Sequence, residues 1–244
     1  MRATRTTLGG LQCGVAQATQ DPPRLLVVLC HGFGATGEDL VSFAPELVHL
    51  RPELEQARFV FPAAPLSLGF TGMGEGRAWW NIDFGSMEAA LREGPPGIQR
   101  LHARTPEGLP QARRMLREAL DVACRQANLP LSRAVLGGFS QGAMVTTDVT
   151  LRLEEAPAGL CVLSGTLICE PEWRRLAPSR AGLPVFQSHG TVDPLLPFPS
   201  AETLRDLLKD AGLGVEFHAF DDAHTIPLEV LRALADFLVK RLPG

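Results

Sequence analysis

Residues Gly137–Val145 read GGFSQGAMV and place one serine between two glycines in an otherwise apolar stretch. The preceding run 134–139, AVLGGF, is typical of a buried strand, and the residues that follow, QGAMVTTDVTLRL, can continue as a helix. Where a strand passes through a sharp turn into a helix, a serine in the turn is held in a strained conformation with its hydroxyl projecting from the sheet. Gly138 and Gly142 fit this geometry because side chains there would collide where strand and helix meet.

Short apolar runs recur along the whole chain and alternate with helical patterns. Near-continuous hydrophobicity in such runs indicates strands that are covered on both faces. The pattern therefore predicts an α/β fold, a mainly parallel sheet with helices on both faces. The expected strands are 25–30, 58–61, 134–139, 160–165, 184–189 and 215–220, and the expected helices are 109–127, 200–211 and 226–242.

One region interrupts this alternation. The length of 244 residues favours a single domain over 1–244. Within it, residues 62–108 are rich in glycine and proline and include two adjacent tryptophans. A long excursion inside a compact domain is usually a lid or a binding loop, so we expect 62–108 to form part of a pocket.

The composition excludes several classes of protein. A net charge of -4 provides no basic field for nucleic acid. The five cysteines are an odd number without zinc-type spacing, which favours a reducing compartment and no metal site. No run reaches the roughly eighteen apolar residues that a membrane span needs, and the N-terminus is too polar for a signal peptide. We therefore expect a cytoplasmic protein without an integral membrane segment.

A serine hydroxyl needs a base to act as a nucleophile at neutral pH, and the base needs an orienting acid. In this fold the three follow the chain order serine, acid, histidine. Asp193 follows the expected strand 184–189, and His224 follows the expected strand 215–220. Because the carboxyl ends of parallel strands share one edge of a sheet, Ser140, Asp193 and His224 are candidates for a catalytic triad.

Other residues compete for these roles. Asp221 and Asp222 lie so near His224 that a loop turn could present either one as the acid, although both are also simple solvated loop charges. Asp193 has its own structural alternative as the start of an Asp-Pro turn. Among the other histidines, His218 falls inside a strand and His189 is a structural residue at a strand end, while His49 and His102 precede the serine.

A tetrahedral intermediate also needs backbone donors for its oxyanion. In such folds one donor follows the nucleophile and another lies in the loop after an early strand. The stretch LCHGFGATGEDL at 29–40 supplies that loop, and the N–H groups of Phe33 and Gln141 are the candidates. The alternatives are a plain glycine-rich turn or a phosphate loop, but the stretch matches neither GxGxxG nor a lysine-bearing P-loop.

Four segments together resemble the phospholipase/carboxylesterase family of α/β-hydrolases, which includes bacterial carboxylesterases and acyl-protein thioesterases. They are LCHGFGATG, GRAWWNID, GGFSQGAM, and HGTVDPLLPF followed by HTIPLEVLRALADFL, in this order along the chain. The resemblance implies the same triad and oxyanion donors and places Trp79 and Trp80 in a substrate pocket. Core packing is the alternative for both tryptophans. Phe33 stands where the family usually has leucine.

The resulting hypothesis is a serine hydrolase for a small-molecule or lipid ester or thioester. The resemblance implies carboxylesterase activity, or lysophospholipase or acyl-protein thioesterase activity. The mechanism requires no metal and no organic cofactor. Two alternatives stay open: a catalytically silent protein that uses the scaffold to bind an acyl or apolar ligand, and an acyltransferase that uses the same triad.

Overall fold

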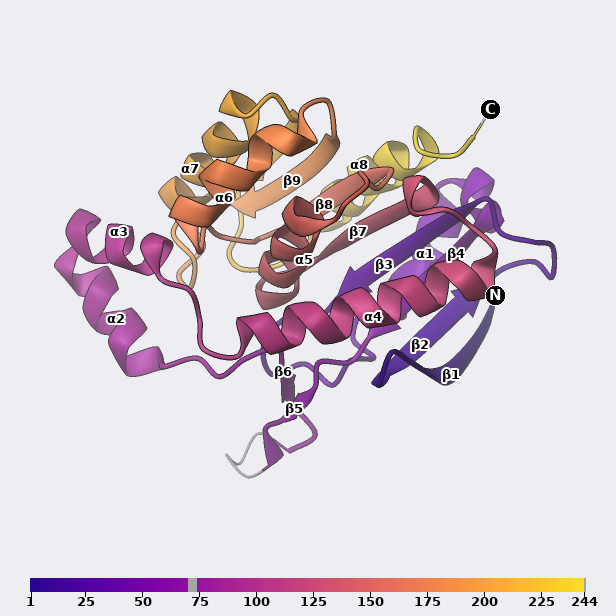
Figure 1. Ribbon diagram of the computed structural model, residues 1–244, viewed down its shortest axis with the longest axis horizontal. Coiled ribbons are helices and arrows are strands. Elements are labelled where there is room, and N and C mark those ends of the chain that lie inside the picture. The colour runs from indigo at the N-terminus through magenta and orange to yellow at the C-terminus, as the bar shows by residue number, and fades with distance from the viewer. Residues whose placement is uncertain (70–73, 244) are drawn as a thin grey trace.

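The computed structural model describes residues 1–69 and 74–243, and a mainly parallel sheet runs through the molecule (Figure 1). The strand order is β1-β2-β4-β3-β7-β8-β9-β10. Only the pairs β1·β2 and β2·β4 are antiparallel; all later neighbours are parallel. The strands are β1 (Arg2–Leu8), β2 (Leu11–Gln17), β3 (Leu25–Cys30), β4 (Ala57–Pro62), β7 (Ala134–Phe139), β8 (Gly159–Leu163), β9 (Pro184–Gly190) and β10 (Gly214–Phe220).

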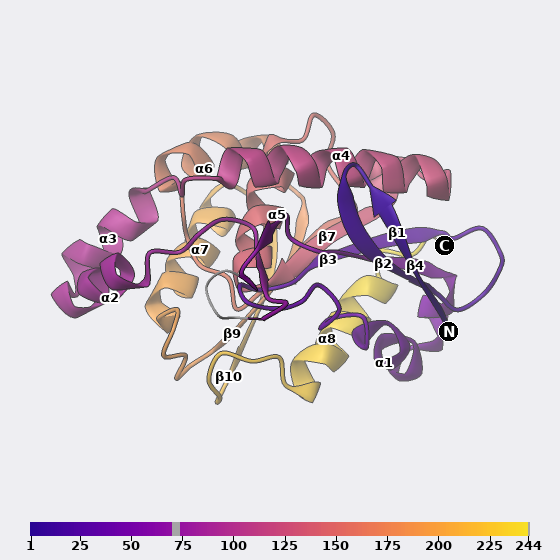
Figure 2. The ribbon, with the colours of Figure 1, turned by 90° about the horizontal axis from the view of Figure 1, so that it is seen from below.

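Helices cover both faces of this sheet, which confirms the expected fold class. One face carries α4 (Leu109–Ala127), α5 (Gln141–Arg152), α6 (Glu170–Leu176) and α7 (Phe198–Asp210), and the other carries α1 (Phe43–Leu50) and α8 (Leu228–Val239). Figure 2 shows α4 and α6 above the sheet and α1 and α8 below it.

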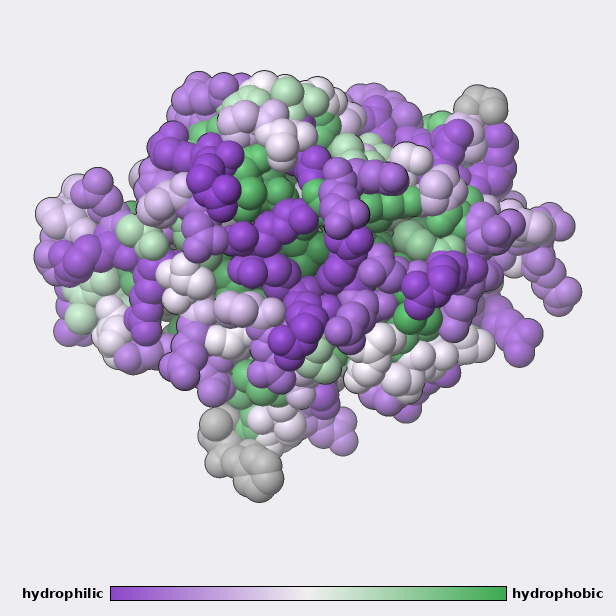
Figure 3. Space-filling view, viewed as in Figure 1, coloured by the Kyte–Doolittle hydropathy of each residue, from purple (hydrophilic) through white to green (hydrophobic). Residues whose placement is uncertain are grey.

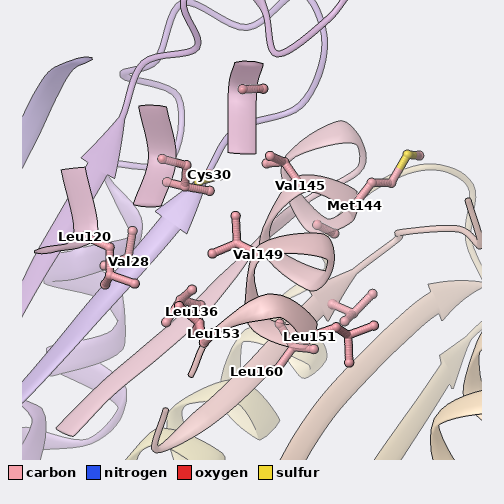
Figure 4. Close-up of a cluster of buried hydrophobic side chains, with 14 of the residues drawn as sticks. Val28, Cys30, Leu120, Leu136, Met144, Val145, Val149, Leu151, Leu153 and Leu160 are labelled. Atoms are coloured by element: carbon pink, nitrogen blue, oxygen red, sulfur yellow. The ribbon is translucent and has the colours of Figure 1, made fainter. Parts of the chain in front are cut away.

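The continuous apolar runs arise because both faces of the strands are buried. Along β3, Val28 and Cys30 point into the core under α4 and α5, while Val27 and Leu29 point into the core under α1 and α8. β7 and β8 alternate in the same way. Figure 4 shows Val28, Leu136 and Leu160 from three strands facing Val145 and Val149 of α5. Period-two alternation is therefore invisible in the sequence of these strands.

The sequence pattern located the central elements better than the peripheral ones. The helix expected at 109–127 is observed at the same bounds, and the other two expected helices begin or end within a few residues of α7 and α8. The hairpin β1–β2 was not predicted, because β1 is an exposed edge strand rich in threonine and arginine. Short helices α1 and α6 were also missed.

The excursion at 62–108 contains regular structure rather than only loop. It holds the small hairpin β5 (Leu66–Ser67) and β6 (Arg77–Ala78), then α2 (Phe84–Glu93) and α3 (Pro95–Ala103). The Asp83 side chain caps α2 by accepting a hydrogen bond from Ser86 N at 3.0 Å. The two helices stand together at one end of the molecule (Figure 1). Positions 70–73 of the excursion lie outside the described residues.

Hydrophilic residues cover most of the face seen in Figure 3. Within 1–69 and 74–243, no helix combines the length and the apolar character that crossing a bilayer demands.

The turn between β7 and α5 depends on a close approach of backbones. A Cβ atom on Gly142 would overlap the carbonyl group of Cys30 at the end of β3, and one on Gly138 would overlap the same oxygen and the backbone of Gly142. The predicted need for glycine at both positions is confirmed. Ser140 lies between them with φ 55° and ψ -119°, a conformation that costs a non-glycine residue of order 1–3 kcal/mol.

We expect Gly142→Ala to lower the free energy of unfolding by about 1–3 kcal/mol. The new methyl group would overlap the Cys30 carbonyl, which is part of the backbone and cannot move aside by a side-chain rotation. Urea denaturation measures this loss. The matched control is Gly85→Ala in the first turn of α2, where a Cβ would meet only Asp83 Oδ1 at 3.5 Å. G85A should keep or gain stability, and equal stability of G142A and wild type would contradict the packing argument.

Candidate active site

Four loops converge at the carboxyl ends of four parallel strands. Phe33 follows β3, Ser140 follows β7, Asp193 follows β9 and His224 follows β10. All except Asp193 line one cavity of about 780 Å³, and Asp193 lies directly behind the His224 ring. Residues that are far apart in the sequence thus meet at one edge of the sheet, as the strand pattern predicted.

Asp193 and His224 are joined by a short hydrogen bond. His224 Nδ1 lies 2.6 Å from Asp193 Oδ2, and only 12% of the His224 side chain is exposed while the carboxyl is fully buried. The other carboxyl oxygen, Oδ1, accepts the backbone N–H groups of Leu195 at 2.8 Å and Leu196 at 2.9 Å. Because the carboxylate accepts from Nδ1, that nitrogen carries the hydrogen, and Nε2 is left free to act as a base.

The pKa of Asp193 lies well below its usual value. Burial by itself raises this pKa, but hydrogen bonds from His189, His224 and the Leu196 amide outweigh burial. The carboxyl group is therefore ionised across the neutral range, as the orienting acid of a triad must be.

The other two candidate acids, Asp221 and Asp222, form hydrogen bonds with other groups. Asp222 Oδ1 accepts the N–H of Ala223 at 2.7 Å, and Asp221 Oδ1 accepts the hydroxyl of Thr191 at 3.4 Å. The loop that carries them crosses the end of β9, where a Cβ on Gly190 would overlap the carbonyls of Asp222 and Ala223. The absence of a side chain at Gly190 therefore lets the loop bring His224 toward Asp193.

Ser140 and His224 face the same cavity from neighbouring loops. The His224 ring packs on Phe139, the residue before the serine, with ring centroids 4.7 Å apart. Across 1–69 and 74–243 no hydrogen bond joins Ser140 Oγ to His224. Catalytic hydrogen bonds are often long in an empty site and tighten when substrate binds.

The two expected oxyanion donors also lie at this site. Gln141 opens α5, so its N–H is one of the first-turn amides that lack an acceptor within the helix. Phe33 lies in the loop next to Ser140, where a Cβ on Gly32 would be 3.3 Å from the serine Cβ. Among the described residues, neither the Phe33 nor the Gln141 N–H has a hydrogen-bond acceptor. Both amides are therefore available to a bound oxygen.

The Gln141 side chain fastens the tryptophan segment to α5. Its Oε1 accepts the backbone N–H of Trp79 at 2.8 Å, and its Nε2 donates to the carbonyl of Trp80 at 2.8 Å. The Trp79 indole donates to the carbonyl of His31 at 3.0 Å. Trp79 is fully buried and is not part of the cavity wall, whereas Trp80 lines the cavity. Of the two tryptophans expected at the substrate pocket, the structure therefore places Trp80 in the cavity wall and Trp79 in the core.

His31 holds the loop after β3 in place. Its Nε2 accepts the N–H of Ala64 at 2.9 Å, so Nδ1 carries the hydrogen and donates to the carbonyl of Gly32 at 2.7 Å. Burial, opposed by the hydrogen bond to Gly32, lowers the pKa of His31, and the neutral ring is the form that this pair of bonds requires. The ring therefore fixes the backbone directly before Phe33.

The cavity wall is mostly apolar. The sequence analysis expected the excursion 62–108 at a pocket but named only Trp79 and Trp80 as individual pocket residues. Helices α2 and α3 contribute Phe84, Met87, Leu91, Ile98 and Leu101, and the opposite side includes Met144, Leu167, Ile168, Leu195 and Leu196. The spacing of positions 84, 87 and 91 is a helical period and could have revealed the apolar side of α2. Over the described residues, no three His, Cys, Asp or Glu side chains gather as a metal site requires.

Asp193→Asn should make the free energy of unfolding depend less on pH in the acidic range. A depressed carboxyl pKa contributes stability that is complete above about pH 5 and is lost as the pH falls through the folded-state pKa. The free energy of unfolding of D193N should therefore decline less than that of wild type between about pH 5 and pH 2. Urea titrations at several pH values measure this, with the exposed Asp210→Asn as a control. An equal decline of the free energy of unfolding in D193N and wild type over this pH range would contradict the expectation.

Comparison with known proteins agrees with this arrangement. The sequence matches the phospholipase/carboxylesterase family over residues 11–242. Acyl-protein thioesterase 1 of Neurospora crassa is 32% identical over 227 residues, which cover 89% of this chain and 86% of that protein. Acyl-protein thioesterase 1 of Debaryomyces hansenii is 27% identical over 229 residues, covering 91% and 93%.

The solved structure of esterase PE8 superposes with a TM-score of 0.74 at 26% identity, covering 99% of this chain and 100% of that one. Its fold agrees with the sheet order and helix layers described above. The chain therefore belongs to the phospholipase/carboxylesterase family of α/β-hydrolases and is a hydrolytic enzyme.

Proposed function

We propose that this enzyme hydrolyses carboxylic esters or thioesters through an acyl-enzyme formed on Ser140. The observation that carries the proposal is the 2.6 Å bond between His224 Nδ1 and Asp193 Oδ2, with the histidine in the same cavity as the elbow serine. The family relatives that are named as acyl-protein thioesterases and as an esterase support the same class of substrate.

In the first half-reaction, Ser140 Oγ attacks the carbonyl carbon while His224 Nε2 takes the hydroxyl proton. Asp193 keeps the ring oriented and stabilises the imidazolium. The N–H groups of Phe33 and Gln141 donate to the oxyanion. The carbon–oxygen or carbon–sulfur bond then breaks, and the leaving alcohol or thiol receives the proton from His224.

In the second half-reaction, water replaces the leaving group. His224 takes a proton from the water as its oxygen attacks the acyl carbon, and the same two amides hold the new oxyanion. The bond to Ser140 then breaks, the serine regains a proton from His224, and the free acid departs. The three side chains and the two backbone amides thus take part in both half-reactions.

The shape of the cavity favours an acyl chain as the group bound beside the serine. Its wall combines aliphatic and aromatic side chains from α2 and α3 with Met144 and Leu196 near the catalytic loops. A volume of about 780 Å³ lies in the range of small-molecule sites. We propose that the acyl chain extends from Ser140 toward the α2–α3 pair.

Ser140→Ala should lower kcat for a p-nitrophenyl ester by about 10⁴- to 10⁶-fold, because the nucleophile is lost while the fold is kept. A fluorophosphonate should label wild type and not S140A, as read by intact mass. Ser132→Ala, an exposed serine before β7, is the matched control and should be labelled like wild type. Near-normal turnover by S140A would refute the proposal.

The same experiment separates the alternatives. A silent binding protein would not be labelled, and it would bind an acyl ligand without releasing product. An acyltransferase would be labelled like a hydrolase, but its acyl product would appear on a non-water acceptor. Product analysis with and without an added alcohol therefore distinguishes hydrolysis from transfer.

A larger side chain on α3 should shorten the acyl site. Ile98→Trp places an indole on the α3 wall of the cavity, so kcat/KM should fall by at least about tenfold for long-chain p-nitrophenyl esters and little for the acetate. Gln99→Trp, on the exposed side of the same helix, controls for the added bulk. Equal losses for short and long esters would contradict the proposed direction of the chain.

A further inference from the structure

A second histidine, His189, lies against Asp193. His189 is the second-last residue of strand β9, and its side chain is completely buried. Its Nε2 lies 2.8 Å from the carbonyl oxygen of Leu196 and 3.2 Å from Asp193 Oδ2. The same carboxyl oxygen accepts from His224 Nδ1. Two imidazole rings therefore share one carboxylate oxygen.

The surroundings fix which nitrogen of His189 carries hydrogen. Both groups near Nε2, the Leu196 carbonyl and the Asp193 carboxylate, can only accept hydrogen bonds, so Nε2 must be the donor. Nδ1 is buried and has no protein partner among the described residues. A hydrogen on Nδ1 would point at no acceptor, and the neutral ring with hydrogen on Nε2 is the form that fits.

His189 also closes the turn that presents the acid. Leu196 donates its N–H to Asp193 Oδ1 at 2.9 Å and receives the His189 N–H on its carbonyl. The histidine thus ties both the far end of the turn and the carboxylate itself to the end of β9. Without this ring, His224 would be the one residue of 1–69 and 74–243 that still contacts Asp193 Oδ2.

We propose that His189 is a positioning residue of the reaction. Its Nε2–H holds the 193–196 turn in place and keeps Asp193 Oδ2 oriented toward His224 Nδ1. This inference rests on the proposed function, because it assigns a role within the Ser140, His224 and Asp193 set. The lowered pKa of Asp193 fits the arrangement, since hydrogen bonds from His189 and His224 are the strongest of the effects that oppose burial.

The charged groups around this site are few. Asp193 and His224 contact each other, while Asp221 and Asp222 on the β10 loop bond to Thr191 and Ala223 instead. From α7, the ring of Phe198 lies beside His189 with centroids 6.2 Å apart. A change in the titration of His224 after substitution of His189 would therefore be transmitted through Asp193.

His189→Leu is the direct test. Loss of the Nε2–H leaves Asp193 Oδ2 a stronger acceptor for the His224 imidazolium, so the acidic limb of kcat/KM against pH should move to higher pH. Loss of orientation should lower kcat by about 10- to 100-fold with little change in KM, the range by which removal of a partner that orients a metal-binding histidine lowers activity in other enzymes. H189Q keeps an N–H near the position of Nε2 and should restore the wild-type limb and most of kcat.

His218→Leu is the matched control. His218 lies on the adjacent strand β10, directly opposite Ser188, and stacks on Phe186 without contacting Asp193. H218L should keep the wild-type pH profile. The inference is overturned if H189L matches H218L in kcat and pH profile, or if H189L and H189Q lose kcat equally with no movement of the limb.

If H189L does not fold, H189N takes its place, because its shorter amide cannot reach the position of Nε2. H189N should then show the shifted limb, and a wild-type profile would overturn the inference. The low-field NMR resonance of His224 Nδ1–H gives a readout without turnover. It should move in H189L or H189N and return in H189Q. Activity retained by S140A would instead refute the proposed function and leave this resonance test standing.

Discussion

The site depends on how closely the first turn of α5 approaches the end of β3. Gly142 comes so near the Cys30 carbonyl that no side chain fits between them. A side chain on Gly138 would overlap the same carbonyl oxygen and the backbone of Gly142. This contact forces Ser140 to a positive φ and starts the helix directly beneath it. The same geometry leaves the Gln141 N–H without an acceptor in the part of the chain that the structure describes, and it brings the loop containing Phe33 alongside. One backbone constraint thus sets the hydroxyl and both candidate oxyanion donors.

A second constraint brings the acid and the histidine together. The β10 loop crosses the end of β9 where Gly190 has no side chain, and it delivers His224 to Asp193. Burial disfavours a charged carboxyl, but two backbone amides and two imidazoles around Asp193 offset that cost. The resulting anion can hold a neutral imidazole in one orientation. On the serine side, Gln141 ties the Trp79 and Trp80 backbone to α5.

The central architecture and the triad candidates could be predicted because their signals are local. Apolar runs mark β3, β7 and β9, and the order serine, acid, histidine points to Ser140 and His224. For the acid, it leaves Asp193 as the first candidate beside Asp221 and Asp222. The β1–β2 hairpin carried no such signal, because an exposed edge strand such as β1 needs few apolar residues. The burial of Trp79 and the contact between His189 and Leu196 depend on where distant loops meet, which no spacing reveals. The helices α2 and α3 were not predicted, because the glycines and prolines of 62–108 suggested a loop.

The most direct test of the account is a crystal structure of the enzyme after reaction with a fluorophosphonate. We expect phosphorus bonded to Ser140 Oγ, one phosphonyl oxygen within hydrogen-bond distance of both the Phe33 and Gln141 N–H groups, and His224 Nε2 facing the adduct with Asp193 still on Nδ1. An adduct on another residue, or a phosphonyl oxygen turned away from these amides, would contradict the assignment of this edge of the sheet as the reactive centre.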